Sequence, residues 1–436
     1  MDRTTYDAYV AILAEELVCA MGCTEPIAVA LCAARAREAL GMTPEHVEVA
    51  ASANIIKNVK SVVVPNTGGA RGIEAAAAAG VVAGDATAEL EVLAGVTEGQ
   101  IAQMQEFLAT HEVRVRPSER PWIFDIQVRV EAGGHTALCE IAGGHTNVIR
   151  LEHDGKVLLE RPCAEDADNS ADSPVAAEKD AGTDRSCLTV EQIVTFADEV
   201  ELDDVRDVLE RQIKCNMAIA EAGLSGSWGA NVGSVLLAAY GDGVANRAKA
   251  WAAAGSDARM GGCELPVVIN SGSGNQGVTA SVPVVVYARE LGASEDELLR
   301  ALTVSNLVSI HLKTGIGKLS AYCGAASAGA GAAAGITYLM GGRYREIAHT
   351  IVNALAIDSG MVCDGAKASC AAKIASAVEA GLLGMQMQRQ GEQFYGGDGI
   401  VVKGVENTIR NVGVLAARGM RETDRTIIDL MCGGAC

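Results

Sequence analysis

Apolar and polar residues repeat with different periods along the chain, and these periods predict where strands and helices form. The segment DIQVRVEA at 125–132 alternates residue by residue, which is typical of a half-buried strand. Two helical stretches, RGIEAAAAAGVVAG and TEGQIAQMQEFLAT, lie among further short strand-like runs. These runs are HVEVAAS, SVVVP, AELEVL, HEVRVRP, HTALCEIAGG and TNVIRLEH. Residues 43–160 are therefore predicted to form an α/β domain.

Helical spacing dominates the rest of the chain. A first helix is expected over residues 4–19, and after a break at Met21-Gly22 a second helix continues from Pro26, so residues 1–42 should pack on a helical domain. That domain is predicted over 188–436, with glycine-rich turns between its helices. Residues 161–187 are acidic, Ala-rich and poor in large apolar side chains, which predicts a flexible insertion. The predicted fold class is α+β: a mainly helical catalytic domain and a smaller α/β domain near the N-terminus.

The uncharged segment 319–342 is long enough to cross a membrane. It consists mostly of Ala, Gly and Ser, with few of the Leu, Ile, Val and Phe residues that drive insertion. We therefore predict a buried helix that packs closely through its small residues, and no membrane association.

Charge and cysteine content narrow the class of protein. The 436 residues carry a formal charge of -20, which argues against nucleic acid or an anionic membrane surface as a partner and suits a soluble enzyme. The 13 cysteines are spread along the chain, and no secretory signal opens it. A reducing cytoplasm is the expected compartment.

Three of the cysteines, Cys323, Cys363 and Cys370, stand in Gly/Ala/Ser-rich surroundings that allow close approach of a bulky group. On one unbroken helix, residues seven apart would be separated by roughly 10 Å along the axis, so a break is expected at Gly365, with Cys370 in the first turn of a new helix. Zinc sites usually use closer cysteine pairs. An iron-sulfur cluster on three thiolates, with one iron open, fits better. Three small buried hydrophobic residues remain an alternative.

Two other segments offer candidate chemistry. Cys23 precedes Thr24-Glu25-Pro26 at a helix N-terminus, where its thiol pKa is expected to be lowered, whereas Cys19 and Cys32 on the flanking helices are expected in the core. The loop NSGSGNQG at 270–277 offers backbone N–H groups and polar side chains for a carboxylate. Lys57 belongs to a second polar, glycine-bearing patch, for which a plain surface loop is the alternative.

Five segments together resemble the L-cysteine desulfidase family, relatives of the catalytic part of iron-sulfur-dependent bacterial L-serine dehydratases. They are GCTEPIAVAL, NIIKNVKSVVVPNTGGARGIEAAAAAG, NSGSGNQG, GKLSAYCGAASAGAGAAAGI and GMVCDGAKASC. The resemblance implies a 4Fe-4S cluster on Cys323, Cys363 and Cys370 and a catalytic role for Cys23. In related dehydratases a C-terminal cysteine can be the fourth cluster ligand, so Cys432 and Cys436 are candidates beside substrate or water.

The resulting hypothesis is a lyase of cysteine catabolism that eliminates sulfide from L-cysteine and yields pyruvate and ammonia. Cys23 would be the base, and Lys318 or His311 would assist near the cluster, although a solvated lysine and a structural histidine are the alternatives. No convincing pyridoxal phosphate site is found. The expected substrate-binding residues are Thr24, Glu25, Lys57, Ser271, Ser273, Asn275 and Gln276.

Two other functions stay open. An L-serine dehydratase would use the same cluster with water as the leaving group. A non-catalytic iron-sulfur redox-sensing module would leave the GCTEP and NSGSGNQG segments without a role. A homo-oligomer is compatible with the sequence.

Overall fold

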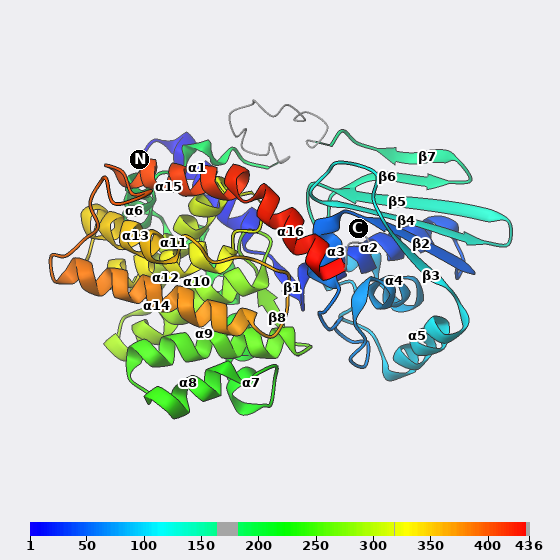
Figure 1. Ribbon diagram of the computed structural model, residues 1–436, viewed down its shortest axis with the longest axis horizontal. Helices are drawn as coiled ribbons and strands as arrows, with labels where there is room; N and C mark the ends of the chain where they lie inside the picture. The colour runs from blue at the N-terminus through cyan, green and yellow to red at the C-terminus, as the bar shows by residue number, and fades with distance from the viewer. Residues whose placement is uncertain (164–181, 318, 433–436) are drawn as a thin grey trace.

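The computed structural model describes residues 1–163, 182–317 and 319–432 and shows an α+β fold. Most of the predicted insertion, residues 164–181, lies outside the described residues, as does Lys318. A largely helical half and a half built on a sheet lie side by side (Figure 1).

The main sheet is mixed, with strand order β3-β2-β4-β5-β6-β7 in the described chain. β2 and β3 are parallel and the other neighbours are antiparallel. Helix α2 packs against β4, β5 and β6, α4 packs on α2, and α5 packs on α4. The strands are β2 His46–Ala51, β3 Val113–Pro117, β4 Asp125–Ala132, β5 His135–Ala142, β6 Val148–His153 and β7 Lys156–Glu160. The helices of this half are α2 Thr24–Leu40, α3 Ala53–Val59, α4 Gly72–Ala83 and α5 Glu98–Thr110.

Two predicted strands are not strands. SVVVP forms a turn with one isolated bridge, Val63 to Arg71, and AELEVL lies largely in the 3-10 helix η1, Ala86–Glu91. The Asp85 side chain accepts a hydrogen bond from the Thr87 N–H and starts that helix. A short apolar run can be buried either as a strand or as a helical turn. Hydrophobic periodicity alone therefore does not distinguish the two.

The helical half surrounds α12, whose small side chains are buried on all sides. A Cβ on Gly331 would lie 2.0 Å from Ser309 Oγ of α11, so only glycine permits this approach. The prediction of a buried small-residue helix is confirmed, and no described helix combines the length and apolar character needed to cross a bilayer. The long helices of this half are α6 Val190–Glu199, α7 Arg206–Ser225, α8 Val232–Tyr240, α9 Val244–Met260, α10 Gly274–Leu291, α11 Glu295–Thr314, α12 Gly324–Leu339, α13 Tyr344–Asp358, α14 Cys370–Arg389, α15 Val405–Val414 and α16 Arg421–Cys432.

The N-terminal helix is shorter than predicted. α1 spans Arg3–Glu16, and the chain then forms strand β1, Cys19–Met21, antiparallel to β8, Pro266–Val268. Cys19 pairs opposite Val268 and is only half-buried, so its assignment to a helix core was wrong, whereas Cys32 is fully buried in α2 as expected. Pairing with a strand more than 240 residues away could not be inferred from the local pattern.

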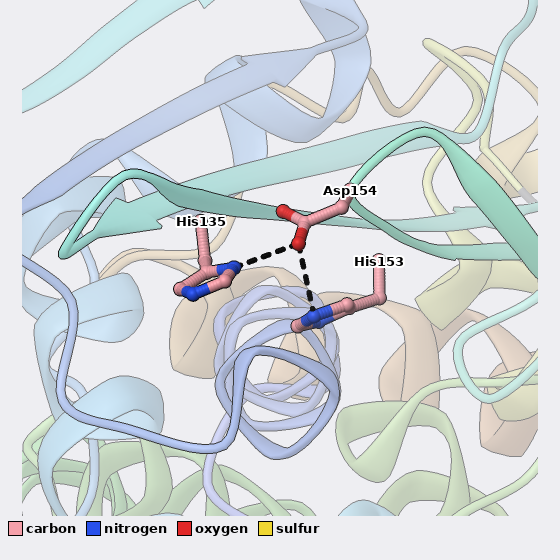
Figure 2. Close-up of side chains that lie close together, drawn as sticks. All are labelled: His135, His153 and Asp154. Atoms are coloured by element: carbon pink, nitrogen blue, oxygen red, sulfur yellow. Dashed lines mark hydrogen bonds and ion pairs between the residues drawn. The ribbon is translucent and has the colours of Figure 1, made fainter.

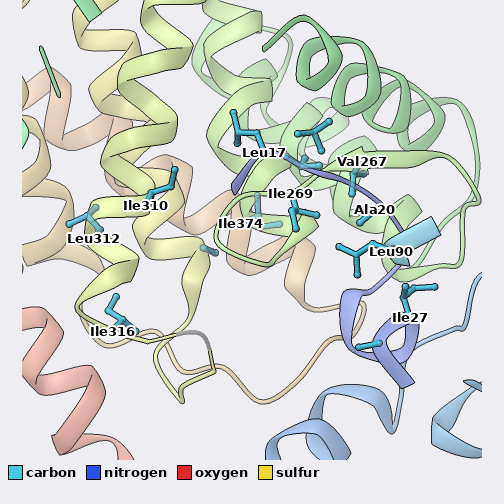
Figure 3. Close-up of a cluster of buried hydrophobic side chains, with 14 of the residues drawn as sticks. Leu17, Ala20, Ile27, Leu90, Val267, Ile269, Ile310, Leu312, Ile316 and Ile374 are labelled. Atoms are coloured by element: carbon cyan, nitrogen blue, oxygen red, sulfur yellow. The ribbon is translucent and has the colours of Figure 1, made fainter. Parts of the chain in front are cut away.

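One hydrophobic core joins the two halves. Figure 3 shows side chains from α2 and η1, such as Ile27 and Leu90, continuing through β1 and β8 to Ile310 on α11 and Ile374 on α14. Because these buried residues form one contiguous cluster, the halves are fixed relative to each other. Residues at their boundary can therefore form a defined site.

Candidate functional site

The three cysteines of the central stretch, here called the cysteine triad, come from three neighbouring segments. Cys323 is the N-cap of α12, Cys363 lies in the loop after α13, and Cys370 begins α14. The Cys323 N–H donates to Met361 O at 3.0 Å, and the Cys363 N–H donates to Ala321 O at 2.6 Å. These bonds hold the segments that carry Cys323 and Cys363 side by side.

The predicted break between Cys363 and Cys370 is confirmed. Gly365 has φ 90°, and a Cβ there would lie 2.5 Å from Lys57 O. Residues 359–369, which connect α13 to α14 and are called the cysteine loop below, therefore pack directly on the backbone of α3. This contact couples the triad to the sheet-containing half.

The charged residues around the triad favour binding of a negatively charged group. Lys373 donates to Val362 O at 2.7 Å and, together with Lys367, pairs with Asp364. Two lysines and one carboxylate give a net positive charge beside the sulfur atoms. Burial, followed by the neighbouring Cys363, raises the pKa of Cys323 to about 12, so a metal group would have to displace its proton.

The spacing of the sulfur atoms tests which metal group the triad suits. Among the described residues, a convergence of three ligand atoms within 4.8 Å occurs at the edge of the sheet and not at the triad. Sulfur atoms on one zinc ion lie at most about 4.6 Å apart, because each Zn–S bond is about 2.3 Å. The triad is therefore too open for a single zinc ion and has the donor set of an iron-sulfur cluster.

Cys23 lies beside the triad although it is 300 residues earlier in sequence. It is the N-cap of α2 and packs with Val62 and Met260 in a small cluster that Cys370 also contacts. Its thiol donates to Glu25 Oε2 at 3.1 Å. The prediction of a lowered pKa was wrong, because burial and the Glu25 carboxylate raise the pKa of Cys23 well above its ordinary value.

Glu25 is a partly buried carboxylate that stays ionised. Burial alone would raise its pKa, but His145, the Cys23 thiol and Arg259 outweigh this and hold the pKa of Glu25 below its ordinary value. Asn58 Nδ2 also donates to Glu25 Oε1 at 2.9 Å. Cys23 and Glu25 thus form a thiol–carboxylate pair in which the proton stays on sulfur and the carboxylate accepts its hydrogen bond.

The loop at 270–277 connects this pair to the triad. Thr24 Oγ1 donates to Gly272 O at 3.0 Å, and Ser273 caps α10 by accepting from the Gln276 N–H. The Gln276 side chain lies against Gly324, where a Cβ would be 2.5 Å from its Cδ. Ser271, with φ 50°, turns the backbone between them. The loop therefore contacts Thr24 through Gly272 and the start of α12, next to Cys323, through Gln276.

Arg259 was not predicted, and the fold buries it in this site. It lies at the end of α9, is 2% exposed, and donates through Nη1 to Asn275 Oδ1 at 3.0 Å. Arg259 Nε, Gln276 Oε1 and Asn58 Oδ1 are buried and lack a hydrogen-bond partner within the described structure. Buried polar atoms are normally satisfied, so these atoms mark room for a polar ligand. The only sequence feature that could have indicated Arg259 is its position as a charged residue in the Ala-rich segment WAAAGSDARM.

A cavity of about 530 Å³ adjoins the site. Met260, which packs on Cys23, forms part of its wall together with Trp228, and two cationic residues, Arg71 and Lys367, line it. The cavity is therefore separated from Cys23 by Met260, and its cationic walls are attractive to an anionic small molecule. Arg71 and Trp228 were not predicted.

The remaining predicted residues differ in how the structure places them. Lys57 is buried and donates to Asp424 of α16 at 2.5 Å, while its carbonyl contacts the cysteine loop. His311 bonds through Nε2 to Glu406 of α15 at 2.7 Å. Lys318 and Cys436 lie outside the described residues, and Cys432 is the last residue of α16.

Comparisons with known proteins place the chain in a family. Residues 87–429 match the family described as serine dehydratase alpha chain. The UPF0597 protein of Desulfitobacterium hafniense (strain Y51) is 54% identical over 430 residues, covering 98% of this chain and 96% of that protein. UPF0597 proteins of Lachnoclostridium phytofermentans and Treponema denticola are 50% and 46% identical, each over 99% of its own length. The chain belongs to the serine dehydratase alpha chain family, as its motifs indicated.

Proposed function

We propose that this protein is an iron-sulfur-dependent lyase that eliminates sulfide from L-cysteine to give pyruvate, ammonia and hydrogen sulfide. The observation that carries the proposal is the packing of the Cys23–Glu25 pair against Cys370 of the triad, beside a cavity with cationic walls. Membership of the serine dehydratase alpha chain family supports a lyase-type reaction on a small amino acid.

Cys323, Cys363 and Cys370 would hold a 4Fe-4S cluster with one iron free of protein thiolate. The open spacing of the sulfur atoms and the net positive charge of the lysines beside them support this assignment. When bound, the cluster supplies a Lewis acid for the substrate and its departing sulfur.

The chain's own residues then bind the substrate and move its proton. The unpartnered polar atoms of Arg259, Gln276 and Asn58 are suited to the carboxylate and ammonium groups of an amino acid. Cys23, as the thiolate left after its proton has passed to water, takes the α-proton. The electron pair of that C–H bond forms the Cα–Cβ double bond, and the Cβ–S pair leaves with sulfide. Hydrolysis of the resulting aminoacrylate gives pyruvate and ammonia.

The supporting residues have defined places in this proposal. Thr24 and the loop residues Ser271, Ser273 and Asn275 hold the substrate-facing side chains in position. Lys57 supports the cysteine loop through its carbonyl. His311 and Lys318 remain proposed helpers near the cluster.

L-serine dehydration is the second candidate function, because the family carries that name. One observation favours sulfide over water as the leaving group. Hydroxide needs a proton donor as it departs, and the carboxyl group beside Cys23 is held ionised, so it is a poor acid. A thiolate departs without that help and is a soft ligand for iron.

The test is turnover by protein reconstituted anaerobically with iron and sulfide. We expect a higher kcat/KM for L-cysteine than for L-serine, with sulfide and pyruvate formed in equal amounts. A higher value for serine would assign the dehydratase reaction instead. Iron binding without turnover of either amino acid would support a redox-sensing module and refute the lyase.

A further inference from the structure

Two histidines and an aspartate converge at the edge of the sheet, remote in sequence from the residues of the lyase site (Figure 2). His135 begins β5, His153 ends β6, and Asp154 occupies the turn between β6 and β7. Asp154 Oδ2 lies 2.7 Å from His135 Nδ1 and 3.3 Å from His153 Nε2. All three potential ligand atoms lie within 4.8 Å of one another.

Backbone groups hold two of these side chains in place. Asp154 Oδ1 accepts a hydrogen bond from the Thr136 N–H at 2.8 Å, which leaves Oδ2 directed at the two rings. The other ring nitrogen of His153, Nδ1, lies 2.7 Å from Ala39 O. Such backbone partners are typical of histidines and carboxylates that bind a metal ion.

The contact with Ala39 fixes which nitrogen of His153 carries hydrogen. A carbonyl oxygen only accepts, so Nδ1 must be the donor, and in the neutral ring Nε2 carries a lone pair. That lone pair faces Asp154 Oδ2 at 3.3 Å, and the oxygen is also an acceptor. Two acceptors at this distance require a proton or a metal cation between them.

We propose that His135, His153 and Asp154 bind a divalent metal ion of the zinc class. Two imidazoles and one carboxylate suit zinc, whereas magnesium and calcium prefer oxygen ligands. Tetrahedral zinc bonds of about 2.0–2.1 Å place neighbouring ligand atoms about 3.3 Å apart. The separation of His153 from Asp154 already has this value, and His135 needs only a small shift. The exposure of His135 leaves the fourth position to water.

The place of this site indicates a structural role. Ala39 lies in the last turn of α2, where backbone carbonyls carry partial negative charge that a cation stabilises. The ion would join the β4–β5 hairpin, the β6–β7 hairpin and the C-terminal end of α2. Cys23 and Glu25 lie at the opposite end of this 17-residue helix, so the ion would anchor the helix and take no part in chemistry.

The test must report on these histidines alone, because cysteine also binds zinc and the chain has 13 cysteines. The full-length protein is treated with diethyl pyrocarbonate across a series of buffered free-zinc concentrations, and the modification of each histidine is measured by peptide mass spectrometry. Zinc should protect His135 and His153 together. His111, which directly follows α5, is the internal reference and should react equally throughout.

Two variants make the result specific. Asp154→Asn keeps an oxygen for the Thr136 N–H but loses the charged ligand, so protection should require at least the roughly 10- to 100-fold more zinc that loss of an outer-shell partner costs. Glu152→Gln, the same kind of change on a neighbouring carboxylate that pairs with Arg150, should leave protection unchanged. Equal modification of His135 and His153 with and without zinc, or unchanged protection in Asp154→Asn, would overturn the site.

Discussion

At the scale of single residues, burial decides the chemistry of Cys23. A helix N-terminus lowers a thiol pKa only while water or cations also stabilise the thiolate. Here the thiol is buried against the Glu25 carboxylate, which raises its pKa. The sequence pattern correctly indicated a helix start at Cys23 but carried no information about this depth or about the neighbouring charge.

Replacing the Cys23 sulfur by oxygen should remove activity while keeping iron. In Cys23→Ser, we expect kcat to fall by about 10²- to 10⁴-fold, the usual contribution of general acid–base help. Iron per chain should stay at the wild-type value, measured by colorimetric iron assay. Cys187→Ser, a change in the short 3-10 helix Arg185–Cys187, is the matched control and should keep both properties. Loss of iron in Cys23→Ser would assign Cys23 to the cluster.

Cys215, unlike Cys23, should be an unusually reactive cysteine. A hydrogen bond from Cys19 lowers the pKa of Cys215 to about 7. A lowered pKa increases the thiolate fraction below the ordinary titration range, so roughly half of Cys215 should be thiolate at neutral pH. Alkylation by iodoacetamide, followed by mass spectrometry, should label Cys215 half-maximally near pH 7. In Cys19→Ala the midpoint should move to higher pH, and an unchanged midpoint would exclude the hydrogen bond as its cause.

At the scale of elements, the pattern predicted what depends on local spacing. The strand at 125–132, the buried small-residue helix and the break before Cys370 are all present. The strand β1 and the 3-10 turn at AELEVL were missed, because the first needs a distant partner and the second competes with a strand of equal apolar content.

The cysteine loop should tolerate a methyl group at one glycine and not at another. In Gly365→Ala, the new Cβ meets Lys57 O and φ is positive, a strain of about 1–3 kcal/mol that displaces Cys363 or Cys370. Iron content after anaerobic reconstitution should fall, together with the melting temperature. Gly360→Ala is the matched control, because its Cβ would meet nothing within 4 Å. Equal iron in both variants would show that the loop adapts.

At the scale of the whole molecule, the C-terminal helix crosses from the helical half to α3 (Figure 1). Lys57 of α3 is 2% exposed and pairs with Asp424 of α16. Sequence spacing suggested both the triad and Cys23 separately, but their meeting point, together with Arg259 and the cavity, depends on how the two halves pack. That packing is set by side chains distributed over the whole chain.

Removing the Lys57–Asp424 ion pair should destabilise the packing of α16 against α3. Asp424→Asn leaves a buried lysine without its charge partner, which costs about 3–5 kcal/mol. We expect lower stability in urea and faster hydrogen exchange across residues 421–431. Asp429→Asn, an exposed position on the same helix, should change neither. Wild-type exchange in Asp424→Asn would mean that α16 is held by other contacts.

The hydrophobic core that Figure 3 shows passing through β1 and β8 should make the whole protein unfold as one unit. Separate cores would melt independently, but a shared one forces the sheet and the helical bundle to lose order together. Scanning calorimetry of the metal-free protein should give one endotherm, and a destabilising change such as Ile27→Ala in α2 should lower the melting temperature reported by probes in the helical half as well. Two resolved endotherms would show that the halves unfold as separate cooperative units.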